Sequence, residues 1–211
     1  MIDCEQVSQT PQFDARIRKS VESAIATIDL LRSDAVFLAT ISRIAQCLIQ
    51  AFRQGNKVLL FGNGGSANDA QHIATELVGR FAFDRPALAA LSLAESFSSV
   101  TAISNDHGFE QVFSRQIEAL GRPGDVAIAI STSGNSPNVL HGVATANKAD
   151  LFTIGLTGHS GGRLRSLVRE CVCVPSDDTP RIQECHTLIG HILSQIVEQE
   201  MFGQRESATH T

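Results

Sequence analysis

The chain has 211 residues, of which 43% are hydrophobic and 18% are charged, and its formal net charge is -5. It contains 11 Phe but neither Trp nor Tyr, which argues against a site that stacks sugar rings or unpaired bases on large aromatic faces. The acidic balance argues against binding to a nucleic-acid backbone. Since neither an apolar run of about 20 residues nor a signal peptide is visible, we expect one cytoplasmic domain that has no membrane partner.

The cysteines are odd in number and lack the C-x-x-C spacing of a zinc ribbon. They are Cys4, Cys47, Cys171, Cys173 and Cys185. We therefore expect reduced, mostly buried thiols in place of a disulfide framework.

Residues 12–54 are predicted to form two helices, which make an N-terminal helical extension over residues 1–55. In the second helix, apolar side chains recur at helical spacing on one broad stripe. They are Val36, Phe37, Ile41, Ile44, Leu48, Ile49 and Phe52. Ser33 is expected to cap the start of this helix, and Gly55 is expected to end it.

From residue 56 onward, short apolar runs alternate with longer helical stretches. The runs of strand length are residues 57–61, 87–93, 126–130, 151–156 and 171–174. Their residues are apolar without alternation, which predicts strands covered on both faces in a five-stranded parallel sheet of a three-layer α/β sandwich. Right-handed crossovers then place the loops that follow the strands along one edge.

A last helix is predicted over residues 181–202, with an apolar face that packs on the sheet or on a second subunit. The α/β domain is therefore expected to span residues 56–202, and residues 203–211 are expected to be a flexible tail.

The first strand runs into Gly62-Asn63-Gly64-Gly65-Ser66-Ala67. This segment contains G-x-G-x-x-A, a form of the dinucleotide fingerprint, but no acidic residue follows at the place that would hold a ribose. A tight turn without a ligand is the other alternative. The glycines let a ligand approach the backbone closely, and the next helix offers free N–H groups to an anion.

The third strand ends in Ser131-Thr132-Ser133-Gly134-Asn135-Ser136, and a helix begins at about Pro137. Hydroxyl groups before a helix N-terminus are typical of a phosphate monoester site, although a serine-rich capping turn is the alternative. The segment Asn105-Asp106-His107-Gly108 has turn chemistry and is expected to reach the same edge.

Chemically active side chains occur on two predicted helices. His72 and Glu76 share one helix face, which suits either a metal or proton transfer. His191 lies in an apolar run of the last helix, either as a core histidine or as a positioned acid or base. Gln183 and His191 differ by about 80° around that helix and by roughly 12 Å along it, so one small ion reaches both only if they lean or belong to different subunits.

These motifs together resemble the SIS domain of the bacterial phosphoheptose isomerases over about residues 15–202. The residues that carry the resemblance are Gly62-Asn63-Gly64-Gly65-Ser66, Asp69, His72, Glu76, Asn105-Asp106, Ser131-Thr132-Ser133-Gly134-Asn135-Ser136 and Arg181-Ile182-Gln183-Glu184 with His191. The family implies a flavodoxin-like sandwich and a homotetramer with sites between subunits. It also implies conversion of sedoheptulose 7-phosphate to D-glycero-D-manno-heptose 7-phosphate through an enediol, the first step of bacterial heptose nucleotide synthesis.

The resemblance also implies roles for individual residues. Glu76 and His191 would be the catalytic proton-transfer pair, and one zinc ion per subunit would be held by His72, Glu76, Gln183 and His191. The phosphorylated seven-carbon sugar would contact Asn63, Gly64, Gly65, Ser66, Glu76, Asn105, Asp106, Ser131, Thr132, Ser133, Ser136 and Gln183.

This chain departs from the family pattern at two positions. Pro180 and Thr75 stand where many or some members carry acidic residues. The main alternative function is a noncatalytic SIS adaptor that binds a replication initiator or senses phosphosugars. Such a protein has no need of both Glu76 and His191.

Overall fold

Five short parallel strands form the centre of the structure, which is a computed structural model that describes residues 11–203. The strands are β1 (Val58–Gly62), β2 (Ala90–Ser92), β3 (Val126–Ile130), β4 (Phe152–Gly158) and β5 (Glu170–Val174). They lie in the order β2-β1-β3-β4-β5, and each neighbouring pair is parallel. The predicted flavodoxin-like sheet is thus confirmed.

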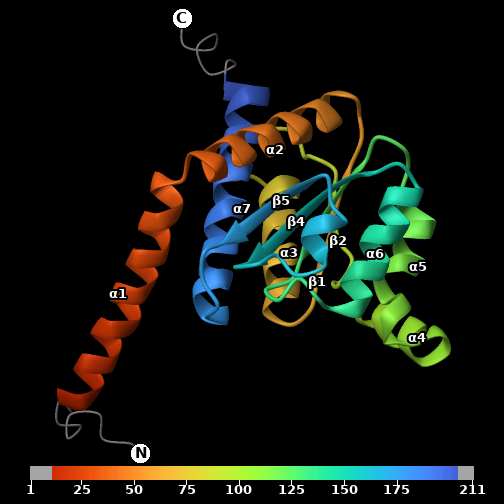
Figure 1. Cartoon of the computed structure of the whole chain (residues 1–211). Helices are drawn as coiled ribbons and strands as arrows, with labels where there is room; N and C mark the ends of the chain where they lie inside the picture. The colour runs from red at the N-terminus through yellow and green to blue at the C-terminus, as the bar shows by residue number, and fades with distance from the viewer. Residues whose placement is uncertain (1–10, 204–211) are drawn as a thin grey trace, which may run out of the picture.

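Helices cover both faces of this sheet (Figure 1). The helices are α1 (Pro11–Ser33), α2 (Ala35–Arg53), α3 (Gly65–Val78), α4 (Phe97–His107), α5 (Val112–Leu120), α6 (Pro137–Lys148) and α7 (Thr179–Phe202). One hydrophobic cluster joins α2, α3 and α7 to one face of the strands. A second cluster joins α5 and α6, with α4 packed at its margin, to the other face. This arrangement confirms the predicted three layers.

The start of α2 differs from the expectation. Asp34, and not Ser33, is the N-cap residue, and its carboxylate accepts hydrogen bonds from the backbone N–H groups of Val36 at 2.8 Å and Phe37 at 3.2 Å. The prediction missed this cap because α1 runs on through Ser33, whose hydroxyl donates to the Asp29 carbonyl of that helix. Val36 is also 74% exposed, so it does not belong to the buried stripe.

Helix α2 is long and apolar enough to cross a membrane by length and composition alone. A core helix passes the same test, and the remaining members of the predicted stripe are buried in the cluster shared with the sheet. Helix α1, in contrast, extends away from the body of the molecule (Figure 1). It exposes a row of apolar side chains, namely Phe13, Ile17, Val21 and Ile25.

The strand order decides where a ligand fits. The chain passes from β1 to β2 on one side and then returns to β3 on the other side of β1. In open parallel sheets, a ligand crevice forms beyond the carboxyl ends of the strands at such a reversal. The loop after β1 and the loop after β3 flank this point. The predicted tail begins at Gly203, and its residues 204–211 lie outside the described part of the chain.

Candidate active site

The glycine loop after β1 brings its backbone close to α7. Gly64 has φ +56°, a conformation that favours glycine, and Gly65 begins α3. A Cβ atom on Gly65 would collide with the side-chain amide of Gln183, so Gln183 lies directly over this loop. The absence of a side chain at position 65 therefore lets α7 contribute a polar group beside the end of β1.

Two other residues of this loop have structural contacts. The side-chain amides of Asn63 and Asn138 exchange two hydrogen bonds, each of 2.8 Å. This pair ties the loop after β1 to the first turn of α6. Ser66 is buried, and its Cβ lies close to Gly62. Asn63 thus joins the two loops at the strand-order reversal, and Ser66 packs within the first loop.

The hydroxyl loop after β3 is folded around Gly134. This glycine has φ +63°, and a Cβ atom on it would collide with the carbonyl oxygen of Gly161. The hydroxyls of Ser131 and Ser136 lie 3.1 Å apart, and Pro137 opens α6 as predicted. A pocket of about 260 Å³ adjoins the loop and includes Thr132 and Ser133 in its wall. The free N–H groups at the start of α6 can therefore add to hydroxyl donors around a small anion.

Asn105 and Asp106 are not in a turn as expected. They belong to the last turn of α4, and the φ of +87° at Gly108 follows the end of that helix. The Asn105 amide donates to the Asp106 carboxylate at 2.8 Å, and both residues are exposed. Asp106 lines a separate pocket with α5 residues. The segment that was expected to form a turn therefore forms the C-terminal end of α4, with Gly108 as the residue that follows the helix.

Three predicted site residues meet between α3 and α7. The Nε2 atoms of His72 and His191 lie 2.7 Å apart, and the Glu76 carboxylate lies 3.7 Å from His72 Nε2. Each of the three residues offers one ligand atom, and these three atoms all lie within 4.8 Å of one another. One turn of α3 separates His72 from Glu76, so the predicted shared face is confirmed.

This group has the chemistry that a divalent metal requires. Two imidazole nitrogens and a carboxylate are standard zinc ligands, and catalytic zinc has three protein ligands and one open position. Zinc bonds of about 2.0–2.1 Å place tetrahedral ligands roughly 3.3 Å apart, a value between the His72–His191 separation of 2.7 Å and the His72–Glu76 separation of 3.7 Å. Gln183 lies over Gly65, and among the described residues no hydrogen bond joins its amide to the three. The residues present therefore fit zinc without requiring Gln183.

The neighbourhood of the group contains residues that the sequence analysis assigned no role. The Phe81 ring centroid lies 5.7 Å from that of His191. Asp69 is buried and accepts a hydrogen bond of 3.0 Å from Thr187, and its second carboxylate oxygen has no partner among the described residues. Burial raises the pKa of Asp69 above its usual range, against the opposing hydrogen bond. Asp69 precedes His72 by about one helical turn, and this spacing is the sequence signal that could have placed Asp69 beside the group.

The two family departures have simple local explanations. Pro180 lies in the first turn of α7, where its missing N–H costs nothing. The Thr75 hydroxyl donates to the Gln71 carbonyl within α3. Neither residue interrupts its helix.

The cysteine prediction is partly wrong. The four described cysteines are free, but only Cys185 is buried, while Cys47, Cys171 and Cys173 are partly exposed. The two cysteines of β5 point to one side of an edge strand, which covers them incompletely. Cys4 lies outside the described residues.

Comparison with known proteins places this site in a family. A family profile described as the SIS domain matches residues 32–158. The chain belongs to the SIS domain family, within the phosphoheptose isomerases. A phosphoheptose isomerase of Burkholderia pseudomallei is 48% identical over 90% of this chain and 96% of its own length. One from Aneurinibacillus thermoaerophilus is 46% identical over 88% of this chain and 94% of its own length.

Solved structures agree with this assignment. The phosphoheptose isomerase of Neisseria gonorrhoeae matches with a TM-score of 0.83 and 37% identity, over 89% of this chain and 99% of that chain. The match of fold and sequence over nearly the full length identifies this SIS domain protein as an isomerase of sugar phosphates. The resemblance inferred from the motifs is thereby confirmed.

Proposed function

We propose that this isomerase converts sedoheptulose 7-phosphate to D-glycero-D-manno-heptose 7-phosphate, the first step of heptose nucleotide synthesis. The observation that carries the proposal is the meeting of His72, Glu76 and His191 within 4.8 Å, on two helices that both begin after the carboxyl ends of strands. The two relatives described above bear the name phosphoheptose isomerase, which supports this substrate.

The side chains suit an enediol mechanism. A base removes the proton from C1 of the ketose, the C1–C2 double bond forms, and the carbonyl oxygen at C2 takes up a proton. The reverse sequence then delivers a proton to C2 and removes one from the oxygen on C1, which leaves the aldehyde. Glu76 and His191 lie close enough to divide these two transfers.

The remaining residues bind and orient the substrate. The hydroxyls of Ser131, Thr132, Ser133 and Ser136, with the start of α6, would hold the 7-phosphate. The Gln183 amide and the backbone around Gly65 would hold sugar oxygens. A zinc ion bound by His72, Glu76 and His191, with Gln183 of the same or another subunit as a further ligand, would polarise the oxygens on C1 and C2.

A homotetramer and a cytoplasmic location belong to the same proposal. The exposed apolar row of α1, which includes Ile17 at 61% exposure, is an unusual surface for an isolated subunit. Helix α1 also touches the site-bearing helix, because the Arg181 guanidinium of α7 donates to the Ser20 carbonyl. Burial of this row between subunits would complete sites in which Asn105 and Asp106 come from a neighbouring chain.

A product assay tests the function directly. Incubation with sedoheptulose 7-phosphate in D₂O should yield the aldose 7-phosphate, with deuterium at C1 or C2. Absence of both product and exchange from assembled protein would falsify the proposal. Binding of the sugar phosphate without turnover would instead support the alternative of a sensor or adaptor.

A further inference from the structure

A buried ion pair joins the segment that follows α3 to the C-terminal part of α7. Arg85, in the segment between α3 and β2, places its Nε 3.0 Å from the Glu198 carboxylate of α7. Their side chains are 2% and 1% exposed. Burial of two charges costs free energy of folding unless further hydrogen bonds satisfy both ions. The other hydrogen-bond partners of Arg85 and Glu198 therefore indicate which parts of the backbone the pair holds in place.

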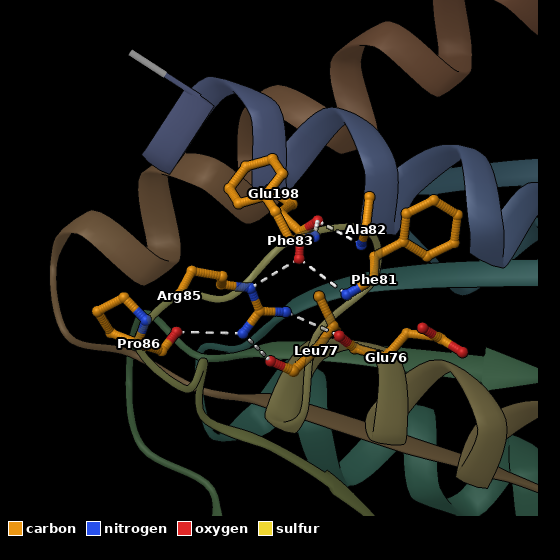
Figure 2. A network of polar contacts seen from close by, with 8 residues as sticks. All are labelled: Glu76, Leu77, Phe81, Ala82, Phe83, Arg85, Pro86 and Glu198. Atoms are coloured by element: carbon orange, nitrogen blue, oxygen red, sulfur yellow. Dashed lines mark hydrogen bonds and ion pairs between the residues drawn. The ribbon is translucent and has the colours of Figure 1, made fainter. Parts of the chain in front are cut away.

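Each partner of the pair makes further hydrogen bonds to the backbone at or after the end of α3 (Figure 2). Arg85 donates to the backbone carbonyls of Glu76 and Leu77, each at 2.7 Å. These carbonyls belong to the last turn of α3, where no helical N–H follows to satisfy them. Figure 2 shows the Glu76 carboxylate pointing away from Arg85. Arg85 therefore fixes the backbone that carries Glu76 and leaves its carboxylate free for the site.

Glu198 fixes the backbone segment that follows α3. Its carboxylate accepts from the backbone N–H groups of Phe81, Ala82 and Phe83 at 2.8, 2.6 and 3.2 Å. Burial opposes ionisation, but these hydrogen bonds and Arg85 outweigh it and lower the pKa of Glu198 below its usual range. The segment so fixed places the Phe81 ring against His191, which lies two turns before Glu198 on α7.

We propose that Arg85 and Glu198 are positioning residues that hold Glu76 and His191 at the mutual spacing that metal binding and proton transfer require. Neither touches the reacting groups. The pair joins the end of α3 to α7 through one charged contact, and a shift at this contact would separate His72 and Glu76 from His191. Only the kinetic part of this proposal rests on the proposed function, because the spacing of the three ligands is also measured by metal binding.

The test compares Glu198→Gln with a matched control, Asp125→Asn. Asp125 is also a buried carboxylate with a cationic partner, Lys57 Nζ at 2.5 Å, and it accepts two backbone N–H groups. It directly precedes β3, and its hydrogen bonds go to Lys57 and Arg122, which lie outside α3 and α7. Both substitutions should lower the unfolding temperature, so the control measures what loss of a buried ion pair does by itself.

Zinc affinity by calorimetry and steady-state kinetics are then measured well below each unfolding temperature. We expect Glu198→Gln to weaken zinc binding and to lower kcat, each about 10-fold to 100-fold, with KM changed less than about 3-fold because the phosphate loop is separate. Asp125→Asn should change neither. Equal zinc affinity in the two variants would overturn the proposal even if the substrate assignment fails.

Two further variants keep the proposal testable if Glu198→Gln does not fold. Arg85→Lys retains the charge but loses the planar fork that reaches two carbonyls and a carboxylate together, so zinc binding should weaken. Phe81→Leu retains the backbone N–H groups held by Glu198 and removes the aromatic contact with His191. It should lower kcat by a smaller factor. Wild-type zinc affinity in Arg85→Lys would overturn the proposal independently.

Discussion

The Nε2 atoms of His72 and His191 lie 2.7 Å apart although 119 residues separate the two histidines. At this distance one ring donates a hydrogen bond and the other accepts it. A metal ion would take the place of that proton and accept both lone pairs. In the proposed mechanism, proton transfer and metal binding would thus depend on the same contact between α3 and α7.

Replacement of Glu76 by Gln should abolish turnover and retain phosphosugar binding. The amide keeps the size of the side chain but cannot accept a proton from carbon, so we expect kcat to fall at least about 100-fold. Kinetics and calorimetry with the substrate measure the two effects. Glu110→Gln changes an exposed carboxylate outside the site and should leave kcat unchanged. Near-normal activity of Glu76→Gln would remove Glu76 from the proposed role.

Removal of zinc should stop the reaction, and its return should restore it. We expect dialysis against a chelator to lower the rate, and His72→Gln to weaken zinc binding about 10-fold or more, because one of three close ligands is lost. Calorimetry with zinc alone measures the second effect. His141→Gln is a suitable control, since His141 is an exposed histidine on α6. A rate indifferent to chelation would assign His72 a purely structural role.

Gly65→Ala should impair the site through Gln183. The backbone of Gly65 needs no positive φ, but the added methyl group would displace the Gln183 amide. We expect a loss of activity of about 10-fold with little change in unfolding temperature. The double variant Gly65→Ala with Gln183→Ala should be no worse than Gln183→Ala alone, because the two changes act on one contact.

Gly203→Ala is the control for the glycine substitution, since the nearest atom to its added methyl group would be 3.9 Å away. Its activity should equal that of the wild type. Additive losses in the double variant would show that position 65 acts independently of Gln183.

Acidification should destabilise the fold through His186. Burial, partly offset by the hydrogen bond to the Thr157 carbonyl, lowers the pKa of His186 from 6.5 to about 4. At pH values between these two pKa values, His186 is mostly protonated in the unfolded chain and mostly neutral in the folded chain. Stability present above about pH 6.5 is therefore lost as the pH falls toward 4, by up to roughly 3 kcal/mol.

Urea unfolding between pH 7.5 and pH 4 measures this loss. His186→Leu should show a shallower fall in unfolding free energy than the wild type over that range, while His141→Gln should follow the wild-type slope because its ring is exposed. Parallel slopes in wild type and His186→Leu would contradict the assignment of this pH dependence to His186.

Local patterns predicted most of the fold. Runs without alternation, such as residues 126–130, became strands buried on both faces, because only a doubly covered strand can bury consecutive apolar side chains. Errors occurred where two local signals compete. Ser33 and Asp34 can both cap a helix, and Asn105-Asp106 can either turn or end one. Packing of the preceding helices decided these cases, and a single sequence does not contain that information.

The sequence by itself determined which chemical groups this isomerase has and that its loops lie at one edge of the sheet, since alternating strands and helices predict parallel strands joined by right-handed crossovers. It also determined that His72 and Glu76 share a helix face. Only the tertiary structure decided that His191 meets them and that Arg85 and Glu198 join the end of α3 to α7. Contacts between helices distant in sequence depend on how α3 and α7 pack together, and helical periodicity within either one says nothing of that packing.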